Sequence, residues 1–203
     1  MQTLRKGELT RSRIVAEAAS AFNQHGYAGT SMQDLMTATG LQKGGIYRHF
    51  ESKEDLAAAA FEHAWNEVKS SRAQGLDEVD GAIAKLKMFV ERFVTIRPRL
   101  AGGCPLMNMT VEADDGNPAL RKLALDALRE WQEQLQEIVA EGIHAGQIEP
   151  STAPRQIANS IIATLEGALM ISRLERSRDA LLEGRFRLFA EFDKISLHNA
   201  DQP

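Results

Sequence analysis

The chain has 203 residues, 43% of them hydrophobic and 26% charged, and its formal net charge is −4. It has one cysteine and no apolar run near the roughly 18 residues of a membrane span, which argues against a disulfide-stapled secreted protein and a membrane protein. The first residues, MQTLRKGELTRSR, lack the apolar centre of a signal peptide, so we expect a cytoplasmic protein that does not bind membranes.

Apolar residues recur at helical spacing along the chain, and the alternating pattern of strands is absent, which predicts an all-α fold. Thr10 is expected to cap a first helix that Gly26 ends. Ser31 starts a short second helix with a capping box in which Asp34 takes the place of the usual Glu. Gly40 ends this second helix.

A third short helix is predicted over residues 43–50, and Ser52 caps a fourth that runs to about residue 71. A fifth runs from about 79 to 97 and stops at Pro98. The segment AGGCPLMNM, residues 101–109, is the least regular part of the body. Further helices are expected over about 118–145, 153–173 and 178–195, and the whole chain should form about nine helices.

The second and third helices, joined by a turn at Gly40, have the layout of a helix-turn-helix, whose second helix presents its N-terminal residues to the DNA major groove. Lys43 and Tyr47 have no evident role in a core, so we expect them to face outward and reach a phosphate or a base edge. Gly44 and Gly45 leave the backbone bare, which permits a close approach to bases.

Charge is distributed unevenly along the chain. Residues 1–50 hold six Lys or Arg against three acidic residues, a balance of +3, and the remainder of the chain therefore carries −7. A basic N-terminal module on an acidic body favours DNA binding by that end of the chain.

The stretch TSMQDLMTATGLQKGGIYRHFESKEDL, residues 30–56, resembles the DNA-binding signature of TetR/AcrR-type transcriptional repressors. The resemblance implies an N-terminal helix-turn-helix domain of three helices over residues 1–54 and a helical ligand-binding and dimerisation domain over residues 55–203. It also implies a set of DNA-contacting positions, which are Thr30, Ser31, Gln42, Lys43, Gly44, Gly45, Tyr47, His49 and Lys53.

Three of these positions need comment. Gly45 stands where Thr, Ser or Ala is more usual in the family, and Gln42 replaces a commoner Ser, so both departures bear on base preference. His49 fits a cap or a plain surface residue as well as it fits a phosphate contact.

By the same resemblance, the second domain binds a small-molecule inducer, and a homodimer binds a palindromic operator in double-stranded DNA until the inducer releases it. Adaptable apolar side chains could line the inducer pocket, although the same spacing fits an ordinary core. The candidates are Met88, Phe89, Phe93, Cys104, Met107, Trp131 and Met170.

Cys104 follows two glycines and precedes Pro105, at the opening of a helix where free amide groups favour a thiolate. Some members of the resembling family sense electrophiles or oxidants through such a cysteine, so modification of Cys104 is a second possible route of release. A buried, unreactive cysteine is the alternative.

The last two predicted helices offer an apolar stripe for a homodimer interface, with packing inside one chain as the alternative. The stripe consists of Ile157, Ile161, Leu165, Ala168, Leu169, Leu182 and Phe189.

Two other functions compete with a ligand-responsive repressor. The first is an architectural DNA-binding protein without a ligand. The second is an all-α di-iron enzyme, for which Glu141 and His144 form one Glu-x-x-His motif, but the second copy that such a site needs is missing. We therefore expect no enzyme activity, no metal and no cofactor.

Overall fold

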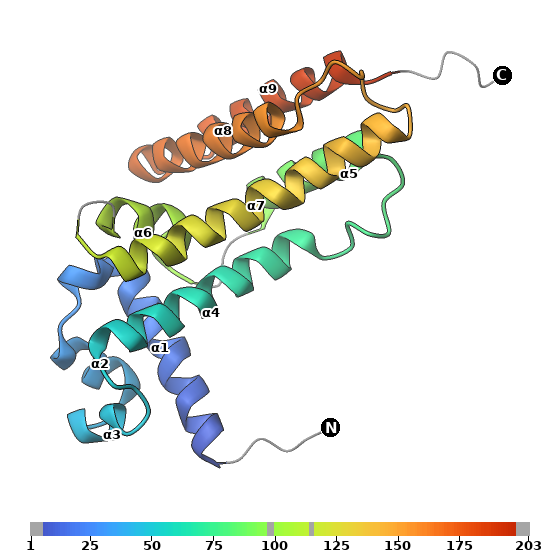
Figure 1. The fold of residues 1–203 in the computed structure, drawn as a ribbon. Coiled ribbons are helices and arrows are strands. Elements are labelled where there is room, and N and C mark those ends of the chain that lie inside the picture. Colours follow the sequence, from blue (N-terminus) through green and yellow to red (C-terminus); the bar gives the residue numbers. More distant parts are fainter. Residues whose placement is uncertain (1–5, 97–99, 114–115, 198–203) are drawn as a thin grey trace. The chain divides into compact units, whose positions relative to one another are not determined.

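The computed structural model describes residues 6–96, 100–113 and 116–197, so Arg97 and Pro98, the expected end of the fifth helix, lie outside the described residues (Figure 1). Within the described residues, the chain is helical and one isolated antiparallel bridge joins Ile148 to Ser196, which confirms the all-α prediction. The helices are α1 Lys6–Gly29, α2 Met32–Thr39, α3 Lys43–Tyr47, α4 Lys53–Ala73, α5 Ala82–Thr95, α6 Pro105–Ala113, α7 Pro118–His144, α8 Pro154–Glu175 and α9 Asp179–Ile195.

Three local predictions differ from the structure. Thr10 lies inside α1 rather than capping it, because its hydroxyl donates to the carbonyl of Lys6 one turn earlier. The segment expected to be irregular contains α6, which begins at Pro105, a residue whose fixed φ suits the first helical turn. The third helix ends at Tyr47 instead of residue 50, and the chain continues as a turn in which His49 and Phe50 donate to the carbonyl of Ile46.

The chain divides into two compact units, residues 1–68 with 98–127 and residues 69–97 with 128–203. The first unit holds α1, α2, α3, α6, most of α4 and the start of α7. The second unit holds α5, α8, α9 and the remainders of α4 and α7. The two units are defined by how densely residues pack together and not by function. They therefore do not test the predicted boundary between a DNA-binding domain, residues 1–54, and a ligand-binding domain, residues 55–203.

In the first unit, α1 packs against both α2 and α6. Its buried side recurs at helical spacing, with Ile14, Ala18 and Phe22 all buried. Burial of a large apolar side chain contributes about 1.5–3 kcal/mol, so this row is sufficient to fix α1 as the support of the helix-turn-helix.

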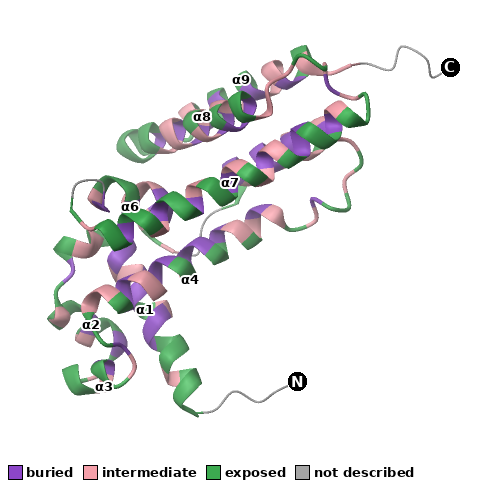
Figure 2. Ribbon diagram, in the orientation of Figure 1, coloured by how far each residue is buried: buried purple, intermediate pink, exposed green. Residues whose placement is uncertain are grey.

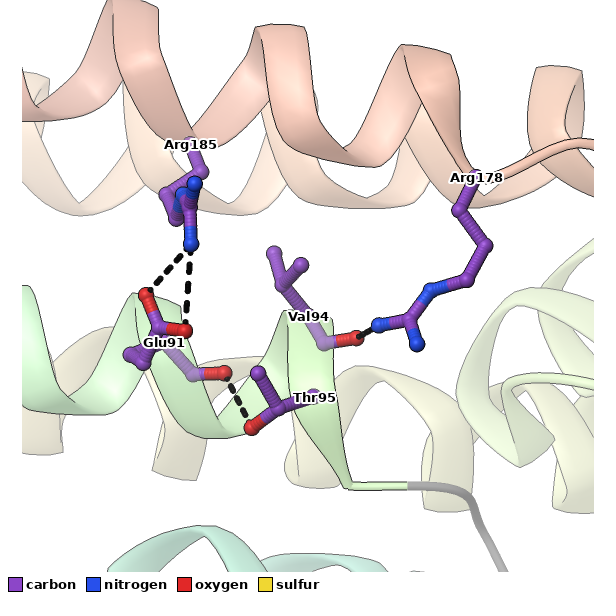
Figure 3. Close-up of polar contacts among 5 residues, drawn as sticks. All are labelled: Glu91, Val94, Thr95, Arg178 and Arg185. Atoms are coloured by element: carbon purple, nitrogen blue, oxygen red, sulfur yellow. Dashed lines mark hydrogen bonds and ion pairs between the residues drawn. The ribbon is translucent and has the colours of Figure 1, made fainter.

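In the second unit, α8 and α9 lie side by side and α5 packs on α9. Polar contacts add to this packing (Figure 3): the guanidinium of Arg185 in α9 donates to both carboxylate oxygens of Glu91 in α5, at 3.1 and 3.0 Å. Arg178, just before α9, donates to the carbonyl of Val94. The ion pair is half-exposed and contributes little free energy, but it fixes the register between α5 and α9.

Among the described residues, α8 is the one helix long and apolar enough to cross a membrane by length and composition, which the search for apolar runs in the sequence did not detect. A third of its most apolar window is buried inside the protein. Core helices of soluble proteins pass the same test, so this feature is weak support for a membrane span.

Candidate nucleic-acid interface

The start of α2 is built as the sequence predicts. The hydroxyl of Ser31 accepts a hydrogen bond from the backbone N–H of Asp34 at 3.2 Å, and the Asp34 carboxylate accepts from the Ser31 hydroxyl and N–H at 2.6 and 2.8 Å. This capping box is therefore confirmed. The hydroxyl of Ser31, followed by its N–H, lowers the pKa of the Asp34 carboxyl below its ordinary value of 3.8.

The turn between α2 and α3 depends on one glycine. Gly40 has φ 67°, a left-handed conformation that side chains disfavour, and it caps α2 at its C-terminus. Leu35, Ile46 and Phe50 are buried beside this turn and join the two helices to the core of the first unit. The hairpin of α2 and α3 is therefore held by a cap at one end, a glycine turn in the middle and apolar contacts beneath.

One side of α3 and the residues that flank it face outward. Gln42, Lys43, Gly44 and Arg48 are exposed, and Tyr47 is 39% exposed. The ammonium of Lys43 lies 5.8 Å from the centre of the Tyr47 ring, so the two side chains occupy the same side of the helix. A cation and a hydroxyl next to the open end of a helix, whose first N–H groups lack partners within the helix, suit a DNA phosphate or base edge.

The fold does not require a glycine at position 44 or 45. A Cβ added at Gly44 meets no atom within 4 Å, and one at Gly45 meets the Cβ of Leu41 at 3.5 Å, an ordinary contact. Neither residue has the positive φ that marks Gly40. Alanine would fit at either position and would stabilise a helix by roughly 0.5–1 kcal/mol. The absence of side chains at both positions is therefore better explained by the close approach of a binding partner to the backbone.

The other predicted contacts have roles within the protein. Thr30 is 0% exposed and its hydroxyl donates to the carbonyl of Gly26 at 2.6 Å, so only its backbone remains for a phosphate. Lys53 is half-buried, and its ammonium donates to the carbonyl of Tyr27 at 2.5 Å and lies 4.4 Å from that ring. His49 is half-buried. Whether His49 and Lys53 also contact DNA stays a prediction.

Two arginines of α1 belong to the same surface, although the sequence analysis counted their charges without assigning them to the site. The guanidinium of Arg11 lies 4.8 Å from the centre of the Phe50 ring, directly after α3. Arg13 donates to the carbonyl of Thr39 at the end of α2. Both arginines are exposed. Their separation from α3 by about 30 positions in the sequence concealed this proximity.

Comparison with known proteins agrees with this geometry. Residues 14–60 match the family described as bacterial regulatory proteins of the tetR family, and residues 82–186 match the tetracyclin repressor-like C-terminal domain. The chain belongs to the TetR family. Members of this family are DNA-binding transcriptional regulators, and the α2–α3 hairpin is the helix-turn-helix of this one.

Similar proteins of the TetR family cover almost the whole chain. The HTH-type transcriptional repressor DhaR of Mycobacterium sp. strain GP1 is 28% identical over 84% of this chain and 86% of its own length. The crystal structure of a TetR transcriptional regulator from Chloroflexus aurantiacus is 42% identical, with a TM-score of 0.91 over 95% of this chain and 98% of that one. A TetR-family regulator from Cytophaga hutchinsonii is 37% identical, also with a TM-score of 0.91, over 98% of this chain and 100% of that one.

The residues predicted to line an inducer pocket fall in both units of this TetR-family protein. Cys104 and Met107 belong to the first unit, and the other five belong to the second. In the second unit, the rings of Phe89 and Phe93 each lie 6.2 Å from that of Trp131. Met88 is half-buried beside them in sequence, while Met170 is exposed on α8. Cys104 is buried directly before α6, where its carbonyl accepts from Asn108.

The aromatic cluster includes a residue that the sequence analysis did not select. The guanidinium of Arg72 is buried and lies 4.1 Å from the centre of the Phe93 ring and 5.0 Å from that of Trp131. An arginine near the end of a surface helix gave no sign of burial in the sequence. Its place among the rings gives the cluster a cationic group as well as apolar faces.

The predicted dimer stripe is largely internal. Ile157, Ile161, Leu165 and Ala168 are buried within a single chain, so they have almost no area left to bury against a second copy. Leu169 and Phe189 are half-buried, and Leu182 is exposed. The burial of Ile157, Ile161, Leu165 and Ala168 within one chain favours packing inside that chain over a dimer contact at these four positions.

The exposed apolar residues of the α8–α9 pair are other ones. They lie toward the end where the two helices are joined, which Figure 2 colours largely as exposed. We call this surface the apical patch. It consists of Met170, Ile171, Leu174, Leu182 and Phe186.

The Glu-x-x-His motif does not form the interior site that a di-iron enzyme needs. Glu141 and His144 are both exposed on α7. The carboxylate of Glu141 lies 3.9 Å from the ammonium of Lys85, on the outside of the helix. A di-iron cage requires carboxylates that project into the bundle, so this motif is a surface feature.

Proposed function

We propose that this TetR-family protein is a transcriptional repressor that binds a near-palindromic operator as a homodimer and is released by a small-molecule inducer. It would act in the cytoplasm, with residues 1–54 as the DNA-binding domain. The observation that carries the proposal is the outward face of α3, where Lys43 and Tyr47 flank two glycines that the fold does not require.

Each predicted contact has a chemical role in this proposal. Lys43 binds a phosphate or a guanine edge, and the hydroxyl of Tyr47 donates to a phosphate. At the start of α2, the capping box already uses the N–H groups of Ser31 and Asp34, so a second phosphate would bind to the N–H groups of Met32 and Gln33 between them. Arg11 and Arg13 add positive charge on the α1 side, since both guanidinium groups lie at the edge of the hairpin.

The homodimer is supported by the apical patch. Leu174 and Phe186 are 79% and 76% exposed and belong to a group of five exposed apolar side chains, and such a group marks a protein interface where a single exposed side chain does not. On α9, an open depression beside Phe186 is bordered by both signs of charge, including Glu183 and Arg187, which can pair with the same residues of a second copy across a two-fold axis. A two-fold dimer would present two α3 helices to successive major grooves.

The inducer site is proposed in the second unit, around Phe89, Phe93 and Trp131. Stacked rings with a buried guanidinium at Arg72 can accept a flat apolar molecule, and the flexible Met88 next to Phe89 can adapt to its shape. Quenching of tryptophan fluorescence in a small-molecule screen, repeated with Trp131→Phe, would locate the site. Quenching that persists unchanged in this variant would exclude Trp131 from it.

Release through Cys104 is a separate proposal. The thiol is buried directly before α6, so only a small electrophile could reach it without local opening. Treatment with a small alkylating reagent should lower DNA affinity in the unmodified protein and leave Cys104→Ser unaffected. Equal responses of the two proteins would rule out this route.

The experiment that tests the main proposal is selection of bound fragments from genomic DNA, followed by measurement of affinity against salt concentration. We expect a near-palindromic site whose affinity falls steeply with salt, because phosphate contacts release counterions. Weak binding without sequence preference would instead favour the architectural DNA-binding protein. Loss of binding on addition of a compound that quenches Trp131 would distinguish a regulator from a protein without a ligand.

A further inference from the structure

The C-terminal end of α1 is broken at Gly26, and α6 fills the break. Gly26 leaves helical geometry, with φ 75° and ψ 174°, and the chain resumes for one turn through Gly29. The break frees the N–H groups of Tyr27 and Ala28 from the helix ladder. Both donate to the carboxylate of Glu112 in α6, the second at 2.9 Å.

Gly26 and Glu112 are matched in space. A Cβ added at Gly26 would lie 2.6 Å from the carboxylate of Glu112, which is closer than a Cβ approaches another heavy atom in real structures. A glycine at this position therefore permits both the positive φ and the contact. The carboxylate occupies the position of an anion at the start of a helical turn.

Two asparagines reinforce the contact between α1 and α6. Asn23 is buried, and its amide nitrogen donates to the carbonyls of Ala101 and Gly103 at 2.8 and 3.2 Å. The amide nitrogen of Asn108 lies 2.9 and 3.0 Å from the carbonyl and side-chain oxygens of Asn23. We call Asn23, Asn108 and Glu112 the α6 clamp.

The segment held by the clamp leads directly into α2. The carbonyl of Tyr27 accepts from Lys53 of α4, Thr30 donates back to Gly26, and Ser31 caps α2. The position of this segment therefore determines where the helix-turn-helix begins. Asn108 and Glu112 lie outside residues 14–60, which match the DNA-binding family description, so two of the three clamp residues come from another part of the chain.

Apolar packing next to the clamp is incomplete. A cavity of about 30 Å³ lies among α1, α4 and α6, and Glu112 and Tyr27 are part of its lining together with alanines such as Ala60. A void of this size is comparable to one water molecule.

We propose that Glu112 is a positioning residue for DNA recognition, whose carboxylate fixes the Tyr27–Ser31 segment and through it the α2–α3 hairpin. This inference rests on the proposed function, because it assigns Glu112 a role in operator binding without contact to DNA. A change in α6 that withdraws Glu112 would loosen the hairpin and lower specific affinity.

The test compares Glu112→Gln with Glu17→Gln, an exposed control on α1 that removes the same charge. A glutamine can accept one of the two N–H bonds but presents its own N–H₂ to the other. We expect operator affinity to fall about tenfold in Glu112→Gln, as for one lost charge-assisted hydrogen bond, while non-specific affinity stays equal to that of the control. Glu112→Asp, which keeps the charge on a shorter side chain, should recover part of the loss.

Hydrogen exchange provides a readout that does not depend on DNA. The amides of Tyr27 and Ala28 should exchange about tenfold faster in Glu112→Gln than in the control. Unchanged exchange would overturn the clamp, whether or not an operator is found. Faster exchange and lower thermal stability with unchanged operator affinity would make Glu112 a structural residue only. Failure of the unmodified protein to select any site would count against the proposed function instead.

Discussion

The α2–α3 hairpin and the α8–α9 pair expose opposite kinds of surface. The hairpin presents Lys43, Tyr47 and bare backbone over a buried apolar contact. The α8–α9 pair presents large apolar side chains, with Leu174 and Phe186 the most exposed among them. The first chemistry suits a polyanion and the second suits a protein surface, which is the division of tasks that the proposed dimeric repressor needs.

The largest effect is expected at the apical patch. Phe186→Asp introduces a charge at the centre of the proposed dimer surface, so the solution mass should fall to that of a monomer. Operator affinity should decrease by at least about 100-fold, because the second head no longer binds as a linked site. Mass by light scattering and affinity by fluorescence anisotropy would measure the two effects.

Leu125→Asp is the matched control, because Leu125 is also an exposed apolar residue, 37% accessible, but lies on α7. It should leave both mass and affinity unchanged. A dimeric Phe186→Asp protein at micromolar concentration would show that the apical patch is not the interface.

The next effect is expected on α3. Lys43→Ala should weaken operator binding by roughly 10-fold or more and reduce the salt slope by about 2, one released counterion for each head of the dimer. Lys122→Ala removes the same charge from an exposed position on α7 and should change neither quantity. An unchanged salt slope in Lys43→Ala would mean that its ammonium does not contact DNA.

Gly45→Thr should alter sequence preference more than stability. The new Cβ meets only Leu41 at an ordinary 3.5 Å, and we expect Tm to change by no more than about 2 °C, since a single surface substitution usually changes stability by less than 0.5 kcal/mol. Selection from a randomised operator library should give a different consensus under α3. An unchanged consensus with a large loss of stability would show that this glycine serves the backbone.

Gly40→Thr is the contrasting substitution. Gly40 has φ 67°, a conformation in which a threonine side chain is strained. The free energy of unfolding should therefore fall by about 1–2 kcal/mol. The pair of variants separates a glycine needed by the turn from a glycine that leaves room for DNA.

The sequence predicted the DNA-binding half of the fold better than the body. The capping box of Ser31 and Asp34 and the turn at Gly40 are local devices, and local patterns are visible in the sequence. Helix α6 was missed because two glycines precede it and its apolar residues are too few to show a period. Thr10 was misassigned because a threonine inside a helix can bond the previous turn as readily as it can cap.

The sequence predicted which segments are helical better than it predicted which side chains are exposed and which residues they contact. Periodicity identified the apolar side of α8 but could not tell whether Ile161 and Leu165 face their own unit or a second chain. Arg11, Arg72 and Glu112 depend on contacts between distant parts of the sequence, so no local pattern marks them. Tertiary contacts, rather than propensity, decide these assignments.

The smallest effect concerns the capping box and its dependence on pH. Asp34→Asn weakens the two bonds from Ser31 and should lower Tm by about 1–2 °C at pH 7. Because the folded-state pKa of Asp34 is lowered, the stabilisation by the carboxylate is complete above its ordinary pKa of 3.8 and is lost as the pH falls below 3.8 through the lowered value. The Tm difference between the two proteins should therefore disappear in acid, and a difference that persists there would show that the bonds to Ser31 do not depend on the charge.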